Sequence, residues 1–320
     1  MATSDFRTKA RSIQEKGIAP LLVLLALLVM LFIGNPASLR GSSVSVTLDQ
    51  AAVLLLLATA QCLIILMGRI DLSNAAMCSA YTVITALVLN GQGPAAIPML
   101  VLLALVVGFA QAWIHMQFQV PSFVVTLGIL GIASGTALVL SEASTILVDE
   151  DAKFASGLYA APNRIPVAFL AALVIVSAIG FLLQRTAWGR ALRAVGLNQR
   201  ATTFSGVNST LVVMSGFMIS NVLILLGAIF TIGQLGTASA QIAHSYLLPG
   251  IAAVVLGGTS IAGGVGGVGR TVWGVLIVSI LRVGLDLVKV PQNAQMIVYG
   301  FIILIAIAVT ADRHRVAVVA

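Results

Sequence analysis

Residues 51–73 read AAVLLLLATAQCLIILMGRIDLS, an apolar run that ends in two charged residues and a serine. A bilayer core about 30 Å thick needs roughly 20 helical residues, and this run with the few residues before it is long enough to cross. The chain is apolar again directly after Ser73, so a second span is expected to begin there. The stretch therefore predicts two membrane helices joined by a tight polar break.

The composition of the whole chain agrees with this prediction. Of the 320 residues, 59% are hydrophobic and only 8% are charged, whereas soluble domains contain roughly 25% charged residues. The mean hydropathy is +1.10. These values exclude an ordinary soluble enzyme, and the short loops leave no room for a separate catalytic domain.

The apolar runs predict an all-α polytopic membrane protein with about ten transmembrane helices, eight at the least. Several runs are short or interrupted by Gly and Pro, so some helices are expected to be broken or half-spanning. The expected spans are residues 18–34, 46–67, 74–90, 96–117, 122–140, 166–184, 210–232, 248–262, 271–290 and 293–311.

The basic residues predict the orientation. With ten spans, twelve of the 17 Lys and Arg residues lie on one side, four on the other and one within a span. Because Lys and Arg concentrate in cytoplasmic loops, both termini are expected in the cytoplasm. The expected division is a basic cytoplasmic segment at 1–17, one transmembrane domain at 18–311 and a cytoplasmic tail at 312–320. Its two long loops are an external one at 141–165 and a basic cytoplasmic one at 185–209.

The break after Met67 has two interpretations. Asp71 and Ser73 can cap a helix that begins near Asn74, which would make the break a cytoplasmic turn. Alternatively, the break belongs to a broken helix along a transport path, since irregular backbone in a membrane is tolerated only against protein or water. On the second interpretation, the path candidates are the polar groups within apolar motifs: Asp71, Ser73, Thr126, Thr259 and Ser260.

A glycine-rich stretch covers residues 257–271 and satisfies GxGxxG through Gly264, Gly266 and Gly269. Nucleotide-binding glycine loops require a soluble strand before them and a helix after them. Here an apolar span precedes the glycines. Close packing of helices through small residues, followed by a tight turn, is therefore the preferred interpretation.

The basic loop at 185–209 contains a predicted short helix that starts at Gly196 and Asn198 and ends at Gly206. A helix parallel to the membrane could form a binding surface for a cytoplasmic partner. The alternative is an interfacial helix held by anionic lipid.

Three charged residues near the end of the ninth span, Arg282, Asp286 and Lys289, have the spacing of one helix face. Charges in a membrane helix are costly unless they are paired, so mutual neutralisation is expected. The alternative is a polar lining at the outer mouth, formed by Arg282 and Asp286.

Metal, cofactor and catalytic sites are not expected. The two cysteines, Cys62 and Cys78, lie in apolar spans, and the three histidines are far apart in the sequence. No Ser–His–Asp or paired-carboxylate pattern is present. The basic residues fall in short loops between spans, which is not the pattern of a nucleic-acid-binding protein.

Four motifs follow one another along the chain: Ile70–Ser73 (IDLS), Pro121–Gly128 (PSFVVTLG), the segment from Gly189-Arg190 to Gly206, and Ile251–Gly264 (IAAVVLGGTSIAGG). They occur in the order found in one family of transporters, and the chain resembles the membrane-spanning permease subunit of ribose/xylose/galactose-type ABC importers. The resemblance covers roughly residues 45–310.

The resemblance implies a multi-pass subunit of the bacterial cytoplasmic (inner) membrane that binds no cofactor itself. Two permease subunits, identical or homologous, would form the pore. ATP would be used by cytoplasmic ATP-binding subunits, and an extracytoplasmic solute-binding protein would deliver a monosaccharide or similar solute. The ATPase-coupling residues implied by the family pattern are Gly196, Asn198, Arg200, Ala201, Phe204, Ser205 and Gly206.

Two alternatives stay open from the residues. The first is a stand-alone secondary carrier or facilitator, suggested by the isolated charges of Asp71 and Asp286. The second is an ABC permease for a nucleoside, an autoinducer or a branched-chain amino acid, because the wider superfamily includes such members.

Overall fold

The computed structural model describes residues 41–149, 157 and 165–310. Within this part, six segments are long and apolar enough to cross a membrane, so the all-α polytopic membrane fold is confirmed. The helices are α3 (Gly41–Leu66), α4 (Asn74–Gln92), η2 (Gly93–Ala96), α5 (Ile97–Gln117), α6 (Ser122–Leu140), α7 (Val167–Arg185), α8 (Ala187–Phe204), α9 (Ser209–Leu235), η5 (His244–Tyr246), α10 (Leu247–Leu256), α11 (Val268–Leu287) and α12 (Gln292–Thr310).

Most helix bounds lie close to the predicted spans, because long apolar runs bounded by polar or glycine-containing breaks have few alternatives to a membrane helix. The predicted span 18–34 lies outside the described residues. The predicted span 248–262 needs correction, since α10 ends at Leu256 and the glycine-rich residues after it are irregular. With ten residues, α10 is shorter than a full crossing of a bilayer requires, so whether it half-spans the membrane stays a prediction.

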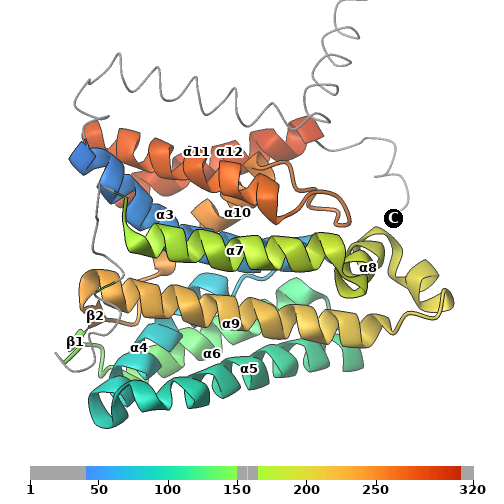
Figure 1. Cartoon of the computed structure of the whole chain (residues 1–320), viewed down its shortest axis with the longest axis horizontal. Helices are drawn as coiled ribbons and strands as arrows, with labels where there is room; N and C mark the ends of the chain where they lie inside the picture. Colours follow the sequence, from blue (N-terminus) through green and yellow to red (C-terminus); the bar gives the residue numbers. More distant parts are fainter. Residues whose placement is uncertain (1–40, 150–156, 158–164, 311–320) are drawn as a thin grey trace, which may run out of the picture.

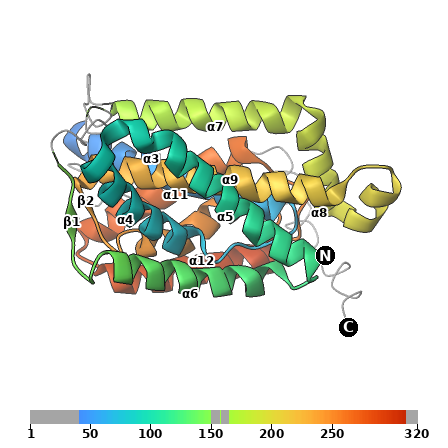
Figure 2. The ribbon, with the colours of Figure 1, turned by 90° about the horizontal axis from the view of Figure 1, so that it is seen from below.

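Helix α3 lies at the centre of the molecule. Its residues from Ala51 to Leu66 are all buried, and it packs against α7, α9, α10 and α11. Helix α9 in turn packs against α4 and α5. In Figure 2, α7 and α6 lie at opposite edges of the molecule.

The outer helices present large apolar side chains to the surroundings, which is expected of surfaces that face lipid. On α5 these side chains recur at helical spacing along one face. The exposed apolar residues of α5, α6, α7 and α12 include Met99, Leu102, Val106, Phe109, Leu127, Ile132, Val139, Val174, Phe181, Ile297, Phe301 and Leu304.

The loops collect at two opposite ends of the helices (Figures 1 and 2). At one end, β1 (Ile146–Leu147) pairs antiparallel with β2 (Thr237–Ala238). This short strand pair was not predicted. Helix α8 lies at the other end, so the described parts of the 141–165 and 185–209 loops are separated by the length of the helices, as the prediction of opposite membrane sides requires.

Candidate functional site

Three segments that are far apart in the sequence meet at the α8 end of the molecule. The backbone N–H of Gly264 donates a hydrogen bond to the carbonyl oxygen of Leu66 (2.9 Å), at the end of α3. A Cβ atom on Gly196 of α8 would overlap that same carbonyl, and one on Gly263 would overlap the backbone of Gly68. Only glycine permits these backbone approaches. The polar break, α8 and the glycine-rich stretch therefore form one junction.

Hydrogen bonds within the glycine-rich stretch, and one from α8, hold this stretch in a compact turn. The N–H of Gly267 donates to Thr259 Oγ1 (3.2 Å), and Arg193 of α8 donates through Nη1 to the carbonyl of Gly266 (2.6 Å). The backbone N–H of Ser260 donates to the carbonyl of Val265 (2.9 Å). Close packing through glycine is found at Gly257, Gly263 and Gly266, where a Cβ atom would overlap neighbouring atoms of the chain.

In the break Gly68–Ser73 the polar side chains Arg69, Asp71 and Ser73 are buried, and Asp71 and Ser73 are bonded to each other. Asp71 Oδ1 accepts hydrogen bonds from the backbone N–H (2.8 Å) and the hydroxyl (2.6 Å) of Ser73. Helix α4 begins at Asn74, as predicted, but the Ser73 side chain makes no cap hydrogen bond; its hydroxyl donates to Asp71 and accepts from Gln111 instead. Thr126 Oγ1 accepts from the backbone N–H of Leu72 (3.0 Å), which fixes the break against α6.

A chain of buried polar side chains extends from the break into the helices. Gln111 donates through Nε2 to Ser73 Oγ (3.1 Å), and Asn221 donates through Nδ2 to Gln111 Oε1 (2.8 Å). Tyr81 donates through its hydroxyl to Asn221 Oδ1 (3.0 Å). The chain joins α4, α5 and α9. Sequence analysis missed Asn221 and Tyr81, although an asparagine in the middle of an apolar span was a visible signal.

Four of the five path candidates, Asp71, Ser73, Thr126 and Thr259, are at most 2% exposed, and Ser260 is half-buried. The first three lie together at the break, and the other two lie in the glycine-rich stretch. In this conformation each of the four buried side chains contacts other parts of the same chain. Their role in a path therefore stays a prediction.

Helix α8 bends at Asn198, whose backbone is extended (φ −162°, ψ 100°). Asn198 Oδ1 accepts a hydrogen bond from the N–H of Ala201 (3.0 Å), so it caps a new short helix, as predicted. That helix ends at Phe204, and Gly206 follows with a positive φ of 84°. The residues before Asn198 are also helical, which was not predicted. Residues 198–206 are called the coupling segment below.

The coupling segment projects beyond the other helices at the α8 end (Figures 1 and 2). The Phe204 side chain is 92% exposed, the largest exposed fraction among the described large apolar side chains. Arg200, Ala201 and Ser205 are exposed as well. The structure thus brings the predicted coupling residues onto one projecting surface, with Gly196 beneath it in the junction.

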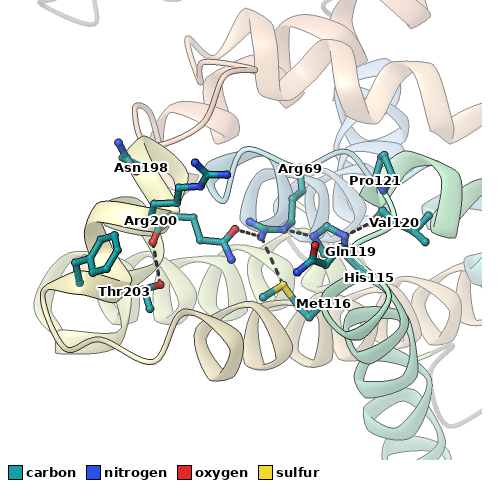
Figure 3. Close-up of a pocket in the computed structure, with 11 residues that line it drawn as sticks. Arg69, His115, Met116, Gln119, Val120, Pro121, Asn198, Arg200 and Thr203 are labelled. Atoms are coloured by element: carbon teal, nitrogen blue, oxygen red, sulfur yellow. Dashed lines mark hydrogen bonds between the residues drawn. The ribbon is translucent and has the colours of Figure 1, made fainter. Parts of the chain in front are cut away.

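A cavity of about 850 Å³ separates the coupling segment from the break (Figure 3). None of its lining residues is acidic. Arg69 donates through Nε to His115 Nε2 (2.7 Å) and through Nη2 to Gln199 Oε1 (2.7 Å). Burial lowers the pKa of Arg69 to about 10, so the guanidinium stays charged at neutral pH. The remaining lining residues are Met116, Gln119, Val120, Pro121, Asn198, Arg200, Thr203 and Phe204.

The predicted mutual neutralisation of Arg282, Asp286 and Lys289 is not found. The Arg282 guanidinium lies over the ring of Tyr246, 5.3 Å from its centroid, and Asp286 Oδ1 accepts from Gln295 Nε2 (2.7 Å). A basic residue that precedes an acidic one by four positions is the weaker order on a helix, and long side chains lean toward the N-terminus. Arg282 therefore reaches away from Asp286.

Among the described residues, no group of three or more His, Cys, Asp or Glu side chains could hold a metal ion. Cys62 and Cys78 are both buried and free.

The family model described as "Branched-chain amino acid transport system / permease component" matches residues 43–307. A probable ABC transporter permease protein of Escherichia coli K12, YphD, is 32% identical, covering 93% of this chain and 90% of its own. The ribose import permease protein RbsC of Bacillus subtilis 168 is 30% identical, covering 98% and 99%. The autoinducer 2 import system permease protein LsrC of Photorhabdus luminescens is 28% identical, covering 95% and 92%. No solved structure matches the chain.

Proposed function

Because the chain belongs to the family of branched-chain amino acid transport system permease components, we propose that it is the permease subunit of an ABC importer for a sugar-like solute. The observation that carries this proposal is the family match over residues 43–307. Relatives that align along nearly the whole chain are named as permeases for ribose or autoinducer 2. The subunit is non-catalytic, and separate ATPase subunits supply the energy.

The proposed orientation places the α8 end in the cytoplasm of a bacterium and the β1–β2 end outside its inner membrane. At the α8 end, Arg69 lies in the break, Arg193 and Arg200 lie in α8, and Arg270 lies in the first turn of α11. An excess of Arg and Lys in short loops marks the cytoplasmic side. With residues 18–34 as an additional first span, this arrangement gives ten spans and cytoplasmic termini.

The coupling segment is the proposed docking surface for the ATPase. A phenylalanine that is 92% exposed beside an exposed arginine is costly in water and suits a protein partner. The competing interpretation, a helix that lies on anionic lipid, is less favoured because the segment projects beyond the helix ends. The junction behind it connects this surface to α3 through Gly196 and Leu66.

The proposed partners at the other end are a solute-binding protein and, beside the chain, a second permease subunit. Asp71, Ser73, Thr126, Thr259 and Ser260 remain the proposed polar groups of the path. The burial of the first four means that solute can reach them only when the break and the glycine-rich stretch move. Such a movement belongs to alternating access, in which packed elements switch between two arrangements.

Reconstitution in proteoliposomes tests the proposed function. The chain is purified with its ATPase, and its binding protein is added outside. Labelled ribose, autoinducer 2 and leucine are compared as solutes. We expect uphill uptake of a sugar-like solute that requires both ATP and the binding protein. Uphill uptake by the chain alone on a proton gradient would show a secondary carrier instead, and selective uptake of leucine would move the solute class to amino acids.

A further inference from the structure

Arg69 connects three parts of the α8 end through a single side chain (Figure 3). Its Nη1 donates to the backbone carbonyl of Met67 (2.7 Å), within the break. Its Nε donates to His115 Nε2 (2.7 Å) and its Nη2 lies 3.8 Å from Met116 Sδ, both at the end of α5. The same Nη2 donates to Gln199 Oε1 (2.7 Å), in the coupling segment.

The bond to His115 extends this connection to a fourth element. Because Nε2 of His115 accepts a hydrogen from Arg69, the neutral ring must carry its proton on Nδ1. Nδ1 lies 2.6 Å from the carbonyl oxygen of Val120 and therefore donates to it. The tautomer is assigned from this geometry. Arg69 thus also fixes the turn between α5 and α6, which carries Val120 and Pro121.

The position of this contact along α8 gives it a specific role. Gly196 packs against α3 before the bend at Asn198, so this packing holds the first part of α8 only. After the bend, Gln199 bonds to Arg69. Among the hydrogen bonds of the described residues, this is the one that joins the coupling segment to the break. Both Arg69 and Gln199 line the cavity between the coupling segment and the break.

We propose that Arg69 is a positioning residue that transmits movement of the coupling segment to the broken span and to the α5–α6 turn. This inference rests on the proposed function. When a docked ATPase moves the coupling segment, the movement of Gln199 displaces the Arg69 guanidinium, which is hydrogen-bonded to Met67 and His115. The break, which holds Asp71 and Ser73, must then follow.

The test measures solute transported per ATP hydrolysed by the reconstituted complex. Arg69→Gln removes the guanidinium that bonds to Met67, His115 and Gln199. Gln199→Leu removes only the hydrogen bond to the coupling segment. We expect both variants to hydrolyse ATP and to bind the ATPase, but to transport at least about fivefold less solute per ATP, the lower range of typical coupling between sites. The double variant should lose no more than the more affected single variant, because both changes break one contact.

Two further variants separate positioning from general structural support. Gln199→Glu offers Arg69 a carboxylate in place of the amide oxygen, so its coupling ratio should stay near that of the wild type. Arg190→Gln is the matched control, since Arg190 is an exposed arginine on α8 outside the junction. It should leave the ratio unchanged.

The inference is overturned if Arg69→Gln keeps the wild-type ratio, or if it loses coupling while Gln199→Leu does not. Should Arg69→Gln fail to fold, the pair Gln199→Leu and Gln199→Glu decides, because Gln199 lies on the projecting segment. A wild-type complex without ATP-dependent uptake would instead refute the proposed function, and the inference would be refuted with it.

Discussion

Gly196 of α8 lies directly against the carbonyl oxygen of Leu66 at the end of α3, and no side chain separates the two backbones. The same carbonyl accepts the N–H of Gly264. The central helix, the helix that leads to the coupling segment and the glycine-rich stretch therefore share one contact point. A contact of this kind allows a movement of α8 to reach the most buried helix without a flexible intermediate.

The first prediction concerns this contact. Gly196→Val places a side chain where Leu66 and Gly264 already lie, and we expect it to destabilise the protein by about 1–3 kcal/mol, as overpacking usually does. Gly128→Val is the matched control, because nothing lies within 4 Å of a Cβ atom on Gly128. Thermal unfolding in detergent measures both variants. Equal melting temperatures would show that α8 can move away from α3 at little cost.

The second prediction concerns Phe204. Its side chain is 92% exposed, so Phe204→Ala should leave the melting temperature unchanged. If the ring inserts into the ATPase, its loss should weaken ATPase binding about tenfold, which corresponds to about 1.4 kcal/mol. Phe181→Ala on α7, where the ring is 63% exposed, is the control. An affinity for the ATPase that is the same in both variants would argue against docking through Phe204.

The spans and the break could be predicted because they depend on local sequence. An apolar run of about 20 residues has few alternatives to a membrane helix. Asn74 follows Asp71 and Ser73 directly, so the start of α4 was visible in the sequence. The cap at Asn198 was equally local, since its side chain bonds Ala201 three positions ahead.

The partners of the polar side chains could not be predicted in the same way. Arg69 and Gln199 are 130 positions apart, and only the packing of α8 against α3 brings them together. Local spacing was misleading at Arg282, where a pairing with Asp286 was expected but the guanidinium lies over the ring of Tyr246 in η5. The irregular end of the predicted span 248–262 was hidden because glycine and alanine are common in membrane helices too.

The third prediction tests the path. Asp71→Asn keeps an acceptor for Ser73 but removes the negative charge, and Asp71 Oδ2 has no hydrogen-bond partner among the described residues. If this oxygen binds solute during transport, the KM for uptake should rise about tenfold or more, since a hydrogen bond to a charged group contributes about 1.5–3 kcal/mol. Gln111→Leu, which removes the hydrogen bond to Ser73 Oγ but changes no path candidate, controls for damage to the break. A normal KM in Asp71→Asn would leave Asp71 a structural role.

The fourth prediction concerns the C-terminal end of α11. Since Arg282 is not paired with Asp286, Arg282→Gln leaves no uncompensated charge behind. The loss of the contact with Tyr246 should cost only about 0.5–1 kcal/mol of stability. If Arg282 belongs to the polar lining of the outer mouth, the variant should show a large loss of uptake from the binding protein with only this small loss of stability. Uptake and melting temperature that decline together would instead indicate a structural role.

The fifth prediction concerns Asn221, which joins Tyr81 on α4 and Gln111 on α5. Asn221→Ala leaves the Tyr81 hydroxyl and the Gln111 carbonyl buried without their partner. Hydrogen bonds between membrane helices contribute on average about 0.6 kcal/mol and at most about 1.7, so the loss of two should destabilise the protein by about 1–2 kcal/mol. Tyr81→Phe removes one bond alone, and a double-mutant cycle in detergent should give a non-additive pair. Strict additivity would mean that the two side chains do not act through a shared hydrogen bond. The chain of hydrogen bonds from the break to α9 would then not extend to Tyr81.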